Sequence, residues 1–60
     1  MKISQNTKPG TRVKMWDEED GKLAYGTLTK AKDDKVYIQW DDIDSECDHG
    51  EDEWPLIEVQ

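Results

Sequence analysis

The chain has 60 residues, with 15 acidic and eight basic side chains and a net charge of −7. A chain this short forms one domain, here residues 1–60, around one small core, and buries only about 60% of the surface that it exposes when unfolded. The negative charge argues against direct binding to nucleic acid or to an anionic membrane, and there is no run of ~20 apolar residues that could span a bilayer.

The single cysteine, Cys47, cannot form an internal disulfide. Small secreted domains usually depend on several disulfides, and the first ten residues, MKISQNTKPG, lack the apolar stretch of a signal peptide. We therefore expect a cytoplasmic, monomeric protein that is a complete small open reading frame.

Alternation of apolar and polar residues recurs along the chain, whereas no helical period is sustained, so the sequence predicts an all-β protein. After the turn at residues 8–10, a first strand is expected over 11–16 with Val13 and Met15 on its inner face. An acidic turn at 17–21 leads to a second strand over 22–31. Gly26 lies inside that strand, which is typical of a bend or of a close backbone approach.

A turn at Asp33-Asp34 separates the second strand from the third, over 35–40, which has the clearest alternation in the chain. Residues 41–53 offer little to a core and are expected to form a long acidic loop, with at most an irregular edge strand. Pro55 restricts the segment 53–59 to an edge strand or a single 3₁₀ turn. Short strands and tight turns in so small a domain favour a closed or nearly closed barrel.

Few residues are available for the core, and with no phenylalanine the tryptophans must supply much of its packing. Trp40 and Trp54 are expected in or beside the core. Trp16 is out of phase with its inward neighbours and is expected to be partly exposed. The aliphatic candidates for the core are Ile3, Val13, Met15, Leu23, Leu28, Val36, Ile38, Ile43, Leu56, Ile57 and Val59.

Charge is unevenly distributed along the chain. Residues 1–35 carry eight basic and six acidic side chains, whereas residues 36–60 carry nine acidic and no basic ones. A surface of one sign lowers the stability of a compact state and attracts basic proteins. The same charge run could also be only a solvated face that promotes solubility.

The segments "GTRVKMWDEEDGKLAYGTLTKAKDDKVYIQWDDIDS" and "EWPLIEV" resemble the Tudor-like group of SH3-like barrels. The resemblance consists of a strand ending in Trp16, an acidic turn closed by Gly21, the run Gly26-Thr27-Leu28, an aromatic followed by acids at Trp40, and a final Trp-x-x-Ile. It implies a small SH3-like barrel of about five short antiparallel strands. It also implies that the turns after the first and third strands lie side by side.

That placement would bring two acidic runs together around exposed indole. The residues expected to bind a partner are Trp16, Asp17, Glu18, Glu19, Asp20, Trp40, Asp41, Asp42 and Asp44. The function expected from them is docking of a basic protein or peptide, with the phage-type inhibitor that mimics DNA as an extreme case.

Two alternatives remain. Trp16 and Trp40 match two aromatic-cage positions of Tudor-like readers of methylated lysine or arginine, but Tyr25 is one place out of phase with a third. An adaptor without a ligand of its own is the other alternative.

A metal site, a cofactor and catalysis are not expected. Cys47, Asp48 and His49 with Glu46 and Glu51 do not have the spacing of a zinc or calcium motif. His49 is expected to be exposed to solvent. No nucleophile and base are arranged for catalysis, and so small a domain has no deep cleft.

Overall fold

The structure, a computed structural model, describes residues 2–60 and consists of one antiparallel sheet with a short 3₁₀ helix. The elements in chain order are β1 (Arg12–Asp17), β2 (Lys22–Lys32), β3 (Lys35–Trp40), β4 (Glu46–Gly50), η1 (Glu51–Leu56) and β5 (Ile57–Val59). Their order across the sheet is β4-β3-β2-β1-β5. The predicted all-β class with five antiparallel strands is confirmed.

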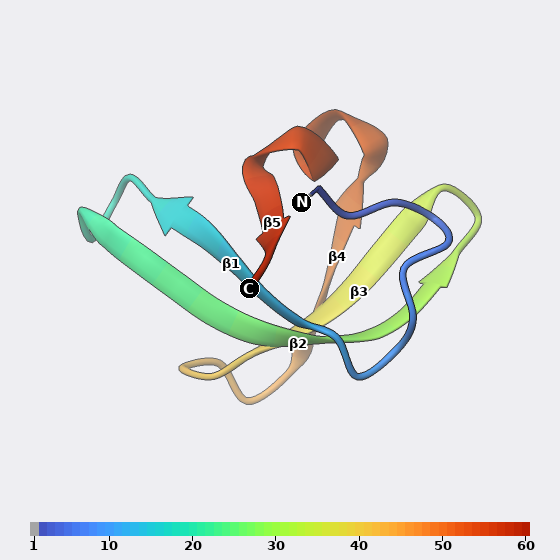
Figure 1. Ribbon diagram of the computed structural model, residues 1–60. Helices are drawn as coiled ribbons and strands as arrows, with labels where there is room; N and C mark the ends of the chain where they lie inside the picture. Colours follow the sequence, from blue (N-terminus) through green and yellow to red (C-terminus); the bar gives the residue numbers. More distant parts are fainter. Residues whose placement is uncertain (1) are drawn as a thin grey trace.

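The sheet is curved but open, so the expected closure into a barrel is not observed. β4 and β5 form its two edges, and no ladder joins them within residues 2–60. η1 lies between them in the chain, and Figure 1 shows it above the sheet on the same side as β4 and β5. η1 contains Pro55, which has no N–H to donate to a ladder.

Most of the segment that was expected to be one long acidic loop has regular secondary structure. Residues 46–50 form β4, which pairs with β3, and residues 51–56 form η1. Only residues 41–45 remain as a connection. Around Pro55 both alternatives are observed, since η1 ends at Leu56 and the edge strand β5 follows it. The edge strand allowed within residues 41–53 is β4, but the expectation that most of this segment is a loop is wrong, because β4 pairs with β3 along its whole length and η1 follows directly.

β2 is the central strand and pairs with both neighbours at Gly26. Gly26 lies opposite Val13 of β1 and opposite Trp40 of β3. A Cβ atom at this position would lie 2.8 Å from Cε3 of Trp40 and 2.9 Å from the carbonyl oxygen of Gln39. The predicted close approach at this glycine is confirmed.

The core lies on the inner face of the curved sheet. Trp40 is 5% exposed and belongs to it, as predicted, and Trp54 is partly buried against it. The core residues are Ile3, Val13, Leu28, Val36, Ile38, Trp40 and Ile57. Three residues proposed for the core from their apolar character, Leu23, Ile43 and Leu56, are exposed instead.

The turn between β2 and β3 is a two-residue hairpin loop, as predicted. Asp33 and Asp34 have φ angles of 54° and 63°, and Lys32 pairs with Lys35 on either side of them. Positive φ at both central residues is the type I′ pattern, which glycine and asparagine adopt more readily than aspartate.

Replacing Asp34 by glycine is therefore expected to stabilise the protein by about 1 kcal/mol, because it removes the steric cost of a left-handed conformation for a residue with a Cβ. Urea unfolding followed by tryptophan fluorescence measures the change. Asp34→Ala is the matched control, because it removes the same charge but keeps a Cβ atom. A glycine variant no more stable than the alanine variant would contradict the conformational explanation.

Candidate functional site

A groove lies between the β1–β2 turn and the β3–β4 connection. Its volume is about 560 Å³. The side of the β1–β2 turn contributes Met15, Trp16, residues 17–20, Ala24 and Tyr25, and the other side contributes Trp40, Asp42 and Ile43. The two turns that were expected to lie side by side thus line one groove.

The β1–β2 turn is shaped by the side chain of its first residue. Oδ1 of Asp17 accepts hydrogen bonds from the backbone N–H groups of Glu19 and Asp20, at 3.0 and 3.3 Å. Gly21, at φ +65°, donates its N–H to the carbonyl oxygen of Asp17 at 2.8 Å. Asp17 therefore holds the turn, as aspartate commonly does.

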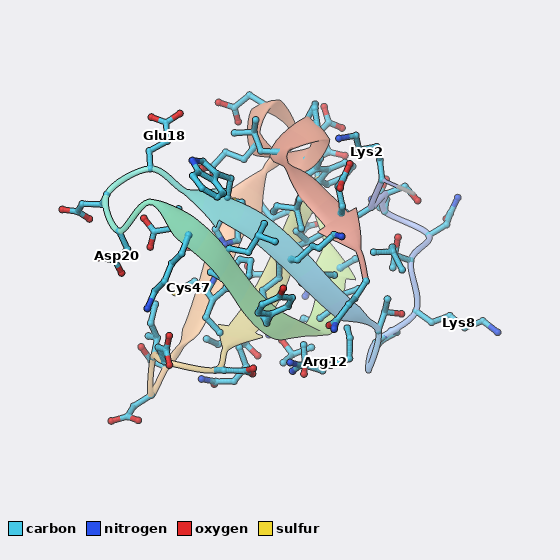
Figure 2. The ribbon with its side chains drawn as sticks, turned by 60° about the vertical axis from the view of Figure 1, so that its left-hand side comes forward. Lys2, Lys8, Arg12, Glu18, Asp20 and Cys47 are labelled. Atoms are coloured by element: carbon cyan, nitrogen blue, oxygen red, sulfur yellow. The ribbon has the colours of Figure 1, made fainter. Side chains whose placement is uncertain are left out.

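The other three carboxylates of this turn are free of that structural role. Figure 2 shows Glu18 and Asp20 pointing outward from the tip of the hairpin, with Lys8 at the opposite side of the molecule. Residues 18–20 are exposed. The turn thus presents negative charge to solvent beside the groove.

The β3–β4 connection is held by one backbone hydrogen bond to β2 and one to β3. The N–H of Asp41 donates to the carbonyl oxygen of Tyr25 at 2.9 Å, and the N–H of Ile43 donates to that of Trp40 at 3.1 Å. The side-chain amide of Gln39 also donates to the carbonyl oxygen of Ile43. These bonds bring Asp42 and Ile43 to the wall of the groove.

Aromatic residues from three strands line the groove. Trp16 is 56% exposed, as the alternation predicted, whereas Trp40 contributes only the small part of its ring that is outside the core. Tyr25 is exposed and pairs with Lys14, so its side chain starts from the face opposite Val13 and Gly26.

Sequence reasoning missed Tyr25, Ile43 and Met15 as groove residues. An apolar residue within the acidic run 41–44 was the available signal for Ile43. Nothing in the local pattern indicates Met15, because an inward position on a strand normally means the core. On β1 the buried core includes Val13, whereas Met15 is only partly buried against it and also lines the groove.

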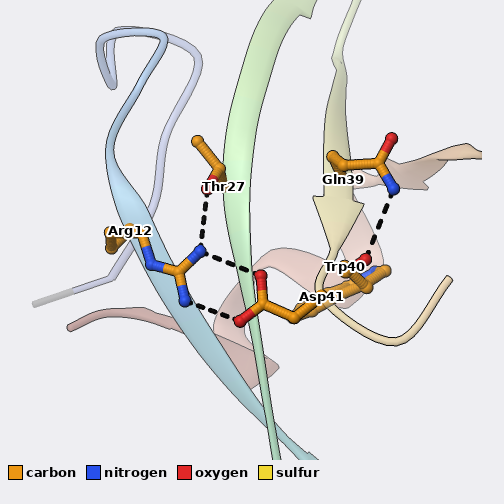
Figure 3. A network of polar contacts seen from close by, with 5 residues as sticks. All are labelled: Arg12, Thr27, Gln39, Trp40 and Asp41. Carbon is orange, nitrogen blue, oxygen red and sulfur yellow. Dashed lines mark hydrogen bonds and ion pairs between the residues drawn. The ribbon is translucent and has the colours of Figure 1, made fainter. Parts of the chain in front are cut away.

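Asp41 is turned away from the groove by an ion pair. The guanidinium of Arg12 donates to both carboxylate oxygens of Asp41, at 3.0 and 2.8 Å, and to the hydroxyl of Thr27 at 2.9 Å (Figure 3). This side-chain hydrogen bond lowers the pKa of Asp41 and raises the pKa of Arg12. Asp44, the other predicted site residue outside the groove lining, is exposed.

The charge separation in the sequence is partly cancelled by folding. Lys30 pairs with Glu46, Lys35 with Asp48 at 3.3 Å, and Lys2 with Glu58 at 3.0 Å. Hydrogen bonds from Lys35 and Lys2 lower the pKa values of Asp48 and Glu58, respectively. Residues 36–60 therefore do not form the surface of one sign that was expected, because folding places Lys30 of β2, Lys35 of β3 and Lys2 near the N-terminus beside their carboxylates.

The groove keeps its negative charge. Its lining includes five carboxylates, from residues 17–20 and Asp42. Within residues 2–60, no lysine, arginine or histidine forms an ion pair with any of them. Five carboxylates without an ion pair thus lie together where indole is also exposed.

His49 is buried, contrary to the expectation of an exposed side chain. Its Nε2 accepts a hydrogen bond from Nε1–H of Trp40 at 3.2 Å, and its Nδ1 lies 3.3 Å from Oε1 of Glu53. Because indole can only donate, Nε2 must be the acceptor and Nδ1 carries the proton. The strand β4 carries this residue inward, which the loop assignment could not anticipate.

Within residues 2–60, no three side chains of the His, Cys, Asp and Glu types are arranged to hold a metal ion, and no helix has the length and apolar character needed to cross a membrane. Comparisons with protein-family models, curated proteins and solved structures found no match.

Proposed function

We propose that the protein is a non-catalytic binding module whose groove docks a positively charged segment of a partner protein. The observation that carries the proposal is the concentration of unpaired carboxylates around exposed indole in one hollow. A cation over an aromatic ring gains about 0.5–2 kcal/mol. Carboxylates nearby add attraction and speed the encounter.

The partner is a protein rather than a nucleic acid or an anionic membrane, because the groove residues and the whole chain are negative. If the partner itself binds DNA, these carboxylates would compete with DNA phosphates for its basic surface. Competition with duplex DNA for such a partner tests this special case. A resemblance to Tudor-like, SH3-like barrels remains part of the proposal, on the sequence pattern alone.

A second candidate is a reader of methylated lysine or arginine. It is favoured by the three aromatic residues Trp16, Tyr25 and Trp40 that line the groove. A peptide carrying trimethyl-lysine should then bind more tightly than the same unmodified peptide, and Trp16→Ala should remove the difference. Equal binding of the two peptides would contradict this candidate and leave the general docking proposal standing.

The docking proposal is tested by reversing charge on the turn. In Glu18→Lys/Glu19→Lys, the affinity for an oligolysine peptide is expected to fall at least about tenfold, which corresponds to about 1.4 kcal/mol. Tryptophan fluorescence, to which the exposed Trp16 contributes, reports the titration. Added salt should weaken binding to the unchanged protein.

The matched control is Glu51→Lys/Asp52→Lys, which changes the net charge by the same amount at exposed residues of η1 that do not line the groove. Binding should change much less in this control. Equal losses in the two variants would show that only net charge matters, and absence of binding by the unchanged protein would refute the groove as a docking site for cations.

A further inference from the structure

The outer face of the sheet carries apolar side chains that the core does not use. Of the five large hydrophobic residues exposed within residues 2–60, only Ile43 belongs to the β3–β4 connection. The other four are Trp16, Leu23, Tyr25 and Leu56, with exposed fractions of 56%, 40%, 39% and 63%. In a protein with so few apolar residues, this is a large share to leave in water.

The register places three of these residues on one face at one end of the sheet. Trp16 lies directly opposite Leu23, and Tyr25 is two residues farther along the same face of β2. Leu56 is the last residue of η1 rather than part of the sheet. Together, Trp16, Leu23 and Tyr25 form an apolar row across β1 and β2, which we call the outer row.

The outer row adjoins the acidic turn. Trp16 is followed directly by Asp17, and Leu23 is separated by one residue from Gly21, which closes the turn. Lys14 lies on the same face, but it pairs in register with Glu58, so the charges on that part of the face are mixed. Trp16 and Tyr25 belong to both the groove lining and the outer row.

Charge decides which occupant fits this face. A second copy of the chain would bring another acidic turn next to the first, and the two would repel, as would two molecules with a net charge of −7. A cationic partner is attracted by residues 18–20 and meets like charge on this face only near Lys14, which lies beside Glu58. Its basic side chains can approach residues 18–20 while apolar side chains cover the outer row.

We propose that the docked segment is amphipathic, with apolar side chains that cover the outer row and basic side chains that meet the acidic turn. This inference rests on the proposed docking of a cationic partner and specifies that partner further. Apolar contact then supplies affinity that salt does not screen, and the carboxylates supply orientation and speed of encounter.

The test uses two synthetic peptides of equal length and equal positive charge. In the first peptide, leucines at the spacing i, i+3, i+4, i+7 form one face of a helix and lysines form the opposite face. In the second peptide, serines replace the leucines. Titration calorimetry against the unchanged protein is expected to show the leucine peptide binding about tenfold more tightly.

In Leu23→Ser the advantage of the leucine peptide is expected to disappear, while the affinity for the serine peptide stays the same. Leu23 is exposed, so the fold should be retained, and circular dichroism checks this. Leu23→Thr provides a second variant with a residue that suits a strand. Ile43→Ser, in the groove but outside the outer row, is the control and should keep the leucine advantage.

An advantage of the leucine peptide that persists in both outer-row variants would overturn this inference without touching the docking proposal. Failure of the serine peptide to bind any variant or the unchanged protein would refute the docking proposal instead. Sedimentation equilibrium of the protein alone tests whether a second copy of the chain covers the outer row. A dimer that the outer-row variants abolish would assign this face to self-association and would refute the inference of an amphipathic partner.

Discussion

Gly26→Ala is expected to destabilise the protein by about 3 kcal/mol or more, at the upper end of the range for overpacking a core. The added methyl group would lie within 3 Å of three atoms, in Trp40, Gln39 and Ile38. One of them is a backbone carbonyl oxygen of β3 that cannot move without breaking the ladder. Since a domain of this size is only marginally stable, a large fraction should unfold at 25 °C.

Urea unfolding followed by tryptophan fluorescence and by far-ultraviolet circular dichroism measures this effect. Gly21→Ala is the control, because Gly21 has a φ of +65° but open space where the Cβ would be. That variant should lose only about 1–2 kcal/mol from backbone strain. If Gly26→Ala were as stable as Gly21→Ala, the close packing of β2 against β3 would be wrong.

His49→Ala is expected to cost about 2–4 kcal/mol, through a buried N–H left without an acceptor and a cavity next to Trp40. His49 is 9% exposed and is the only buried polar residue within residues 2–60. Its imidazole also stands edge to face against the Trp40 ring, with centroids 5.8 Å apart. The loss should therefore affect both hydrogen bonding and packing.

Glu53→Gln is the matched control, because it changes the other partner of the same imidazole but leaves Trp40 with its acceptor. It should cost less than about 1 kcal/mol, as is usual for an exposed partner. The indole N–H resonance of Trp40 in a nitrogen–proton correlation spectrum should move markedly in His49→Ala and little in Glu53→Gln. Similar spectra for both variants would contradict the assigned bond.

The position of His49 also links the core to the groove. The indole N–H of Trp40 donates its hydrogen bond to His49, and Trp40 also lines the groove. A variant that releases this ring would therefore alter the groove wall as well as the stability. Partner-binding experiments should accordingly use substitutions on the exposed turn, such as those at Glu18 and Glu19.

Residues with strong local preferences were predictable from the sequence alone. The third strand was predicted with its observed bounds, because successive side chains of a strand point to opposite faces and so produce an alternation of apolar and polar residues. The hairpin at Asp33-Asp34, the close approach at Gly26 and the 3₁₀ turn around Pro55 were also predicted. In each case the residue's own backbone chemistry restricts the conformations available.

The groove was only partly predictable. Its acidic turn and its exposed indole follow from the run after Trp16 and from the phase of that residue on β1. The loss of Asp41 from the groove did not follow, because it depends on Arg12, which is distant in sequence and close only through the β1–β2–β3 pairing. Pairing register is a property of the whole sheet.

The sequence by itself determined where the first three strands and the turns between them form, how many carboxylates the second half carries and which indole is exposed. The tertiary structure alone decided which of those carboxylates remain unpaired, that the sheet stays open, that His49 enters the core and that Leu23 lies opposite Trp16. The physical reason is the range of the interactions. Backbone preferences act over a few neighbouring residues, whereas ion pairs, burial and shared faces depend on strands brought together from distant parts of the chain.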